Sequence, residues 1–168
     1  TPLTRLKLQL AMINNKEISN NMSKDIDEME NMLNDYLQFA KTQAKENTEK
    51  VHLKDLFDII EKRIKNSNLS IKIENDVSFY GRKNALQRCF SNVINNSLMY
   101  GEKINITVQK SSNRAVILFD DDGPGIPPEH YRNVFKPFFR LDKSRSLNKS
   151  GVGLGLAIVE DIVHSHGG

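Results

Sequence analysis

A run of three acids at residues 120–122 leads directly into the Gly-Pro-Gly sequence of residues 123–125. A carboxylate can accept a hydrogen bond from an exocyclic amine, and glycines let a flat ring lie against the backbone. Asp121, near the end of an expected strand, is the acid that we predict to bind such a ring. A calcium loop is disfavoured, because the acids are consecutive and no distal glutamate follows at the required distance. A surface turn remains the alternative, since Asp-Gly and Gly-Pro pairs often mark turns.

A polar stripe runs along an expected helix over residues 83–100. Asn92, Asn96 and Tyr100 are spaced four residues apart, so they stay within a sector of roughly 80° on one face. The other faces carry residues that suit a core: Leu86, Phe90, Val93, Ile94 and Ser97. Asparagine oxygens are good ligands for a hard cation such as Mg²⁺. A plain exposed polar face is the alternative, since asparagine is common throughout this chain.

Two further segments could contribute to a site. Gly151, Gly153 and Gly155 open the last expected helix, where backbone N–H groups and the helix dipole favour an anion. The pattern lacks the preceding strand of a dinucleotide fold and the lysine of a P-loop, so alone it indicates little. Phe135 and Phe138 precede a polar loop, and we expect both to be core anchors that hold the base of that loop.

Composition limits the classes of protein that these residues could serve. The chain has 168 residues, 38% of them hydrophobic and 27% charged, which is ordinary for one or two small globular domains. The net charge of +3 is too small to indicate nucleic acid or a membrane surface as a partner. The single cysteine, Cys89, excludes an intramolecular disulfide framework and a cysteine zinc site. No apolar run approaches the length of a membrane span.

The first 44 residues show helical periodicity. Apolar residues recur at spacings of three and four on both sides of a polar break at residues 14–21. We therefore expect two helices in an antiparallel hairpin, each with a narrow apolar seam. Pairing with a second copy would bury both seams in a four-helix bundle, which predicts a homodimer. Packing of the hairpin on the rest of its own chain is the alternative.

The remainder of the chain mixes strands and helices. A linker at 44–50 precedes the expected elements: a helix at 51–64, strands at 69–75 and 77–81, the helix at 83–100 ended by Gly101, strands at 103–110 and 115–120, a short helix at 127–134, a mobile loop at 142–150 and a helix at 154–166. Strands with helices packed on one side predict an α+β sandwich.

The order of these motifs is more specific than any one of them. Asn92-x-x-x-Asn96-x-x-x-Tyr100, Asp121-x-Gly123-x-Gly125, Phe135-x-x-Phe138 and the last glycine series resemble, in this order, the N, G1, F and G2 boxes of the sensor histidine kinase ATP-binding domain. That domain belongs to the GHKL superfamily, shared with gyrase, chaperone and mismatch-repair ATPases. The opening sequence, Thr-Pro-Leu-Thr-Arg, resembles the segment that follows the phosphorylated histidine in this family. Together with residues 24–26 and 121–126, it resembles the osmosensor kinases.

The resemblance implies a fold and two domains. Residues 1–47 would be a dimerisation and phosphotransfer hairpin, cut before the phosphoacceptor histidine. Residues 51–168 would be an ATP-binding domain, a Bergerat-type α/β sandwich whose C-terminal strands lie beyond this chain. None of the four histidines, His52, His130, His164 and His166, matches the phosphoacceptor.

The resemblance also implies the cofactors, ATP and Mg²⁺, and the residues that bind them. Asn96 would hold Mg²⁺ and Asp121 would bind the adenine amino group, while loop 142–150 would be a lid over the nucleotide. The full implied nucleotide-binding set is Asn92, Asn96, Tyr100, Asp121, Gly123, Gly125, Ile126, Arg140, Lys143, Arg145, Gly151, Gly153, Leu154 and Gly155. One departure stands out: Met99 occupies a position where the family usually has lysine or arginine.

The activity implied is transfer of the γ-phosphoryl group of ATP to a histidine and then to an aspartate of a response-regulator receiver domain. By the same resemblance Thr1 would orient water for dephosphorylation of the regulator. The chain would be the cytoplasmic part of a bacterial inner-membrane sensor, attached to the membrane only through preceding segments, and it would not contact nucleic acid. A nucleotide-binding dimeric scaffold without kinase activity and an ATP hydrolase of the wider superfamily are the alternatives.

Overall fold

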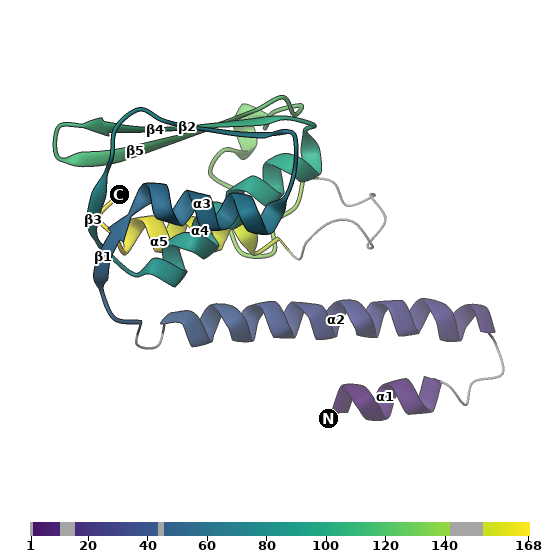
Figure 1. The fold of residues 1–168 in the computed structure, drawn as a ribbon. Coiled ribbons are helices and arrows are strands. Elements are labelled where there is room, and N and C mark those ends of the chain that lie inside the picture. The colour runs from purple at the N-terminus through teal and green to yellow at the C-terminus, as the bar shows by residue number, and fades with distance from the viewer. Residues whose placement is uncertain (1, 11–15, 44–45, 142–152) are drawn as a thin grey trace.

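A short helix and a long helix open the chain. The computed structural model describes residues 2–10, 16–43, 46–141 and 153–168. Helix α1 (Pro2–Leu10) lies beside α2 (Lys16–Gln43) and runs in the opposite direction (Figure 1), and the Ser19 hydroxyl donates a hydrogen bond to the Leu10 carbonyl oxygen at 2.8 Å. Residues 16–21, expected to lie in the polar break, belong to α2, which begins at Lys16, and the lysine and glutamate at its start are good helix formers.

An apolar stripe on α2 is left uncovered in the single chain. Its members are between 45% and 53% exposed: Ile18, Met22, Met29, Leu33 and Leu37. These are positions of the predicted seam, which the two helices of one chain bury only in part, since Ile26 of the same seam is 6% exposed. Among the described residues, no helix has both the length and the hydropathy to cross a bilayer.

The remainder of the chain contains a three-stranded sheet, and helices cover one of its faces (Figure 1). The elements are β1 (Glu49–His52), α3 (Leu53–Ile64), β2 (Leu69–Ile73), β3 (Ser78–Gly81), α4 (Lys83–Tyr100), β4 (Ile104–Ser111), β5 (Arg114–Asp121), the 3₁₀ turn η1 (Pro128–His130) and α5 (Gly155–His164). The sheet order is β2-β4-β5, with β2 and β4 parallel and β4 and β5 antiparallel, while β1 and β3 form a separate antiparallel pair. This arrangement confirms the predicted α+β class.

The core lies between the sheet and helices α3, α4 and α5. Alternate residues of β4 are fully buried, as expected for a sheet with one covered face. The rings of Phe57 and Phe90 stack with centroids 5.0 Å apart, and Phe90 reaches Phe119 of β5 at 6.1 Å. Cys89 is 2% exposed, and burial raises the pKa of its thiol to about 11. The thiol therefore stays protonated near neutral pH and is a core residue, not a nucleophile.

Strand β1 was not expected from the sequence. Residues 44–50 were predicted to be a linker and Val51 to open a helix, whereas Val51 lies on a strand opposite Phe79 and the helix begins at Leu53. The error has a physical reason: a four-residue strand is specified by pairing with a distant partner, and local periodicity does not indicate such pairing. The short helix expected at 127–134 contains only the three-residue turn η1.

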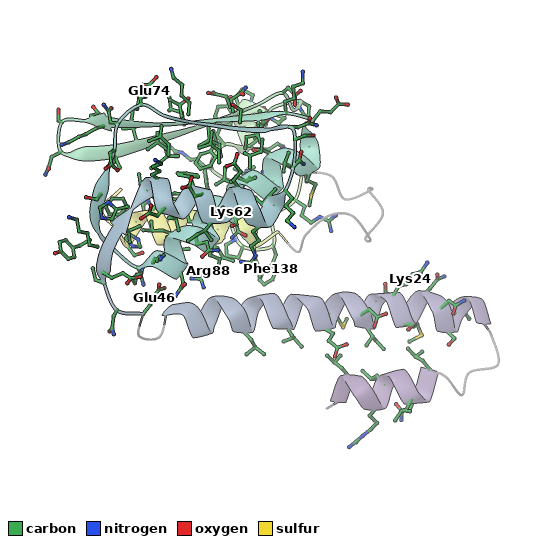
Figure 2. All side chains as sticks on the ribbon, in the orientation of Figure 1. Lys24, Glu46, Lys62, Glu74, Arg88 and Phe138 are labelled. Atoms are coloured by element: carbon green, nitrogen blue, oxygen red, sulfur yellow. The ribbon has the colours of Figure 1, made fainter. Side chains whose placement is uncertain are left out.

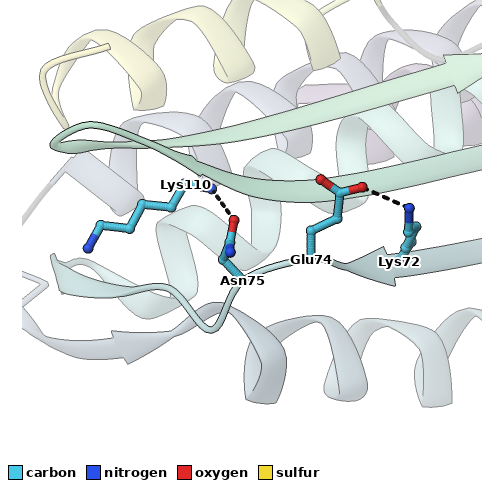
Figure 3. A network of polar contacts seen from close by, with 4 residues as sticks. All are labelled: Lys72, Glu74, Asn75 and Lys110. Atoms are coloured by element: carbon cyan, nitrogen blue, oxygen red, sulfur yellow. Dashed lines mark hydrogen bonds and ion pairs between the residues drawn. The ribbon is translucent and has the colours of Figure 1, made fainter.

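The far end of β2 is tied to β4 by side chains and backbone (Figure 3). The amide oxygen of Asn75 accepts a hydrogen bond from the Lys110 backbone N–H at 3.0 Å, and the Glu74 N–H donates to the Val108 carbonyl at 2.9 Å. The Lys72 ammonium lies 2.8 Å from a Glu74 carboxylate oxygen. Both side chains of this ion pair are exposed, so it adds little, and the backbone contacts set the geometry.

The N-terminus of α4 is held by two segments that are distant in sequence. The Glu46 carboxylate accepts hydrogen bonds from the backbone N–H groups of Asn84 and Ala85, the second at 3.0 Å. His166, just beyond α5, accepts the Arg82 N–H at 3.1 Å through its Nε2. Because α4 has no capping side chain of its own, Glu46 supplies the missing acceptor. Its negative charge also interacts favourably with the positive end of the helix dipole.

We expect Glu46→Ala to lower the free energy of unfolding by about 1 kcal/mol, because two N–H groups of α4 lose their acceptor. Urea unfolding would measure the change. Glu61→Ala, at an exposed position on α3, is the matched control and should stay close to the parent. Equal stabilities for the two variants would show that Glu46 does not cap α4.

Candidate functional site

Three segments meet around the C-terminal half of α4. The Asn92 side-chain amide lies 3.4 Å from the Gly155 carbonyl oxygen, which joins the polar stripe to the start of α5. A Cβ at Gly123 would lie 3.4 Å from the Tyr100 carbonyl oxygen, so the loop after β5 passes close to the end of α4. The Phe138 N–H donates to the Gly153 carbonyl at 2.9 Å. The predicted motifs are therefore neighbours in space, although they are spread over more than sixty positions of sequence.

Asp121 is held at the end of β5 by two hydrogen bonds. Its Oδ2 accepts the Ser97 hydroxyl at 2.8 Å, and its Oδ1 accepts the Gly123 N–H at 3.0 Å. A carboxylate offers about four acceptor positions, so each oxygen retains one for a ligand. The side chain is on the exposed side of the strand end. This arrangement provides a fixed acceptor that is open to solvent, as the predicted ring-binding role requires.

Ser97 is a site residue that the sequence placed among the core positions. It is 4% exposed, which agrees with that prediction, but its hydroxyl points to the Asp121 carboxylate. The signal that could have found this contact is the residue type, because a hydroxyl buried among apolar neighbours needs a hydrogen-bond partner.

The loop after β5 leaves part of its backbone uncovered. Gly125 has a φ of +73°, and a Cβ built on it would have no atom within 4 Å. This is a left-handed conformation that glycine adopts without strain. Ile126 is half-buried beside it, and Gly123 sits in a tight place where a Cβ would lie 2.9 Å from Asp121 Oδ1. A flat ring can approach the Gly125 backbone without meeting a side chain.

The stripe on α4 is placed as predicted, with two half-buried amides followed by a partly exposed ring. Asn92 and Asn96 are half-buried, and Tyr100 is 40% exposed. No other residue within the described ranges makes a hydrogen bond to the Asn96 side chain, so its amide oxygen is available there. Met99 is exposed next to Tyr100.

Gly101 ends α4 where it was predicted, but it does so for a different reason. Its φ of −118° is extended backbone, not the left-handed conformation expected of a terminal glycine. A Cβ there would lie 2.7 Å from Asp122 Oδ1 and 3.0 Å from the Gly123 nitrogen. Glycine is therefore required by the close approach of the loop after β5.

The third segment joins the phenylalanine motif to the last helix. Leu154 is buried, and Gly155 is the first residue of α5. Gly153 has a φ of +81°, and a Cβ there would lie 2.8 Å from the Phe139 carbonyl oxygen. Arg140 is half-buried just before the end of the described segment. Thr1, Lys143, Arg145, Gly151 and loop 142–150 lie outside the described residues, so their predicted roles stay predictions.

Phe138 is not the core anchor that the sequence predicted. Its side chain is 53% exposed (labelled in Figure 2), and its φ of 65° is unusual for a residue with a Cβ. The backbone hydrogen bond to Gly153 fixes the chain in a direction that turns the ring outward. Phe135 is half-buried, and the buried residue of this segment is Val134.

We expect Gly153→Ala to destabilise the fold by about 1–3 kcal/mol, since the alanine would combine a left-handed backbone with a clash against residues 138–139. Gly167→Ala is the matched control, because Gly167 has a φ of +82° but open space around it. Thermal unfolding would compare the two, and an equal loss would show that the contact with the phenylalanine segment is unimportant.

Asp122 closes the loop onto the residues after α4. Its Oδ1 accepts the backbone N–H of Lys103 at 2.8 Å and that of Glu102 at 2.7 Å. These bonds, the Lys103 bond foremost, hold the pKa of the Asp122 carboxyl below its ordinary value of 3.8. Asp122 therefore braces the loop that carries Asp121.

The lowered pKa of Asp122 gives a pH-dependent prediction. A carboxyl whose pKa is lower in the folded state contributes stability above its unfolded pKa, and this is lost as pH falls through the folded pKa. The parent should therefore lose stability relative to Asp122→Asn as pH falls below 3.8. Urea unfolding at a series of acid pH values would measure the difference, and a difference independent of pH would contradict the assignment.

The fold and this site define the class of the protein. The model of the family described as histidine kinase-, DNA gyrase B- and HSP90-like ATPases matches residues 81–168. The sensor histidine kinase GtrS of Pseudomonas aeruginosa is 34% identical over 170 residues, covering 100% of this chain and 35% of that protein. The chain thus spans about a third of that relative's length.

Solved structures agree with this assignment. The NMR structure of the histidine kinase domain of the Escherichia coli osmosensor EnvZ is 30% identical, with a TM-score of 0.56, covering 74% of this chain and 78% of that one. Full-length ShkA in complex with AMPPNP shares the fold at 19% identity and a TM-score of 0.69, covering 93% of this chain and 35% of that one. The chain belongs to this ATPase family and contains the ATP-binding domain of a sensor histidine kinase.

Proposed function

We propose that this chain is the catalytic core of a sensor histidine kinase that binds ATP with Mg²⁺ and transfers the γ-phosphoryl group to a histidine. The single observation that carries the proposal is the Asp121 carboxylate, fixed by Ser97 and Gly123 and still open to a ligand. An adenine amino group is the ligand that such an acceptor fits, beside the uncovered backbone of Gly125.

The nucleotide would extend from Asp121 along α4 towards the start of α5. Gly123, Gly125 and Ile126 would line the base, and Tyr100 would flank the nucleotide at the end of α4. Gly153, Leu154 and Gly155 would offer backbone N–H groups to the phosphates, with Gly151, Arg140, Lys143 and Arg145 as further contacts. The α5 N-terminus supports this, because its dipole favours negative charge.

Asn96 is the residue that we propose to hold Mg²⁺, with Asn92 beside it. The fit rests on an amide oxygen that has no partner among the described residues and on the preference of Mg²⁺ for oxygen ligands. Among the residues described, no group of three or more His, Cys, Asp or Glu side chains could hold a metal ion alone. Bound Mg²⁺ would neutralise charge on the phosphates, and this chain's part is to position it.

The proposal includes a division of the chain into two domains. Residues 1–47 would form a dimerisation hairpin and residues 51–168 the catalytic domain. The exposed stripe of α2, which includes Met22, Met29 and Leu33, would be buried by a second copy in a four-helix bundle. The phosphoacceptor histidine would lie just before Thr1, and Thr1 would take part in dephosphorylating the regulator.

The partners and location follow from the same proposal. The aspartate of a response-regulator receiver domain would receive the phosphoryl group, and the homodimer would be the working unit. The chain would lie in the cytoplasm, as part of an inner-membrane protein whose other segments reach the membrane.

Label transfer would test the proposal. A piece of the protein that includes the residues before Thr1 would be incubated with ATP labelled in the γ-phosphate, with Mg²⁺ present. We expect label on the protein that survives base and is lost in acid, as a phosphohistidine would be. Release of labelled phosphate with no label on the protein at any time would indicate an ATP hydrolase instead.

A nucleotide-binding scaffold is the second candidate, and Met99 is the observation that favours it. Met99 is exposed beside Tyr100, at the position where the resemblance implies a cation for the phosphates. Bound ATP without any transferred or released label would support the scaffold. Met99→Lys would then be expected to restore transfer, if the missing cation is the cause.

A further inference from the structure

We propose that Ser97 is a positioning residue that orients the Asp121 carboxylate and so selects a purine with a 6-amino group. This rests on the proposed function, in which Asp121 binds adenine. The contact itself is direct: the Ser97 hydroxyl donates to Asp121 Oδ2 at 2.8 Å. Ser97 is also the most buried polar residue among those described, at 4% exposure. Burying a hydroxyl costs free energy unless the hydroxyl makes a hydrogen bond, and the Ser97 hydroxyl makes this bond with Asp121.

Both members of the contact are anchored on regular structure. Ser97 lies on the last turn of α4, where its carbonyl oxygen accepts the Gly101 N–H at 2.7 Å. Asp121 is the last residue of β5 and pairs with Ile104 of β4, a fully buried residue. The distance between hydroxyl and carboxylate is therefore set by the packing of helix against sheet. Side chains held by a helix and a strand are positioned more precisely than side chains held by a loop alone.

The pair of donors on Asp121 fixes its orientation. Ser97 occupies one acceptor position on Oδ2 and the Gly123 N–H occupies one on Oδ1, so the carboxylate cannot rotate without breaking both. The positions that remain are acceptors on the side away from Ser97. A 6-amino group can donate to them, whereas a 6-carbonyl would face an acceptor and be repelled. Removing Ser97 leaves only Gly123 to hold the carboxylate.

The consequence is that removal of the Ser97 hydroxyl should selectively weaken the binding of ATP. Ser97→Ala should weaken the binding of ATP about tenfold, because one hydrogen bond to a charged group and the preorganisation it supplies are lost. Binding of purine riboside triphosphate, which lacks the 6-amino group, should change less than about twofold, because that nucleotide does not use the oriented acceptor. A role in packing alone would weaken both nucleotides equally.

Calorimetric titration with each nucleotide and Mg²⁺ would test this on the parent, Ser97→Ala, Ser97→Thr and Asp121→Asn. Ser97→Thr keeps the hydroxyl and should retain most of the ATP affinity. Ser91→Ala, on the same helix, is the matched control and should bind both nucleotides as the parent does. Equal losses for the two nucleotides in Ser97→Ala, or no loss for either, would overturn the role of Ser97.

The comparison with Asp121→Asn separates the positioning role of Ser97 from the proposed adenine contact of Asp121. If Asp121→Asn loses ATP affinity and Ser97→Ala does not, Ser97 has no positioning role although the proposed adenine contact stands. If Asp121→Asn binds ATP as tightly as the parent, the adenine contact is wrong and the role of Ser97 falls with it. A loss in both variants, with the double variant no weaker than Asp121→Asn alone, is the expected result.

Discussion

Replacing Asp121 with asparagine is expected to weaken ATP binding about a hundredfold, a loss of about 3 kcal/mol. The carboxylate accepts from Ser97 and Gly123 and has acceptor positions left for the adenine amino group. An asparagine side chain keeps one oxygen but adds an NH₂ donor, which would face either the Ser97 hydroxyl, the Gly123 N–H or the ligand's own amine. Calorimetric titration with ATP and Mg²⁺ would measure the affinity.

The neighbouring acids provide matched controls for Asp121→Asn. Asp120 pairs with Asn105 on β4 and is exposed, so Asp120→Asn should change the affinity less than about twofold. Asp122→Asn should also leave the affinity near that of the parent at neutral pH, because its oxygen can still accept the N–H groups of Lys103 and Glu102. Similar losses in all three variants would mean that general charge, not one oriented carboxylate, attracts the nucleotide.

Replacing Asn96 with alanine is expected to lower the proposed phosphoryl transfer more than about a hundredfold while leaving the oligomeric state of the parent unchanged. Asn96 is half-buried on the face of α4 that also carries Asn92, and no other described residue occupies its amide by hydrogen bonding. Alanine would remove the proposed Mg²⁺ ligand without disturbing the core face of the helix. Transfer of label from ATP would be followed in a piece of the protein that includes the residues before Thr1.

Asn95 provides the control for this second variant. It is the adjacent residue, carries the same side chain and points to solvent, so Asn95→Ala should transfer label at the rate of the parent. Sedimentation would establish that both variants have the parent's oligomeric state. Transfer that persists in Asn96→Ala would mean that the metal is held elsewhere.

The parts of the fold with strong local signals could be predicted from the sequence. Helix α4 spans residues 83–100 as expected, because its apolar and polar faces follow the helical period without interruption. Strands β4 and β5 were found from their alternation, and their register brings Asp121 to the end of the sheet beside the end of α4. The motif spacing could therefore predict which segments form the candidate site.

The parts that depend on contacts between distant residues could not be predicted. Strand β1 exists because it pairs with β3, and Phe138 is exposed because a hydrogen bond to Gly153 directs its backbone. The sequence indicated that Ser97 is buried, but not that its partner is Asp121 at the end of β5. In each case the residue's own preference is weak, and tertiary contacts decide its conformation.

The central claim is that ATP occupies the space between the end of α4, the loop after β5 and the start of α5. Backbone amide chemical shifts, followed by NMR during titration with ATP and Mg²⁺, would test it most directly. The account predicts that the largest shifts occur at Gly123, Gly125 and Gly155. Shifts confined to the outer face of the sheet, for example at Ser70 and Lys72, or the absence of any shift at saturating ATP, would contradict it.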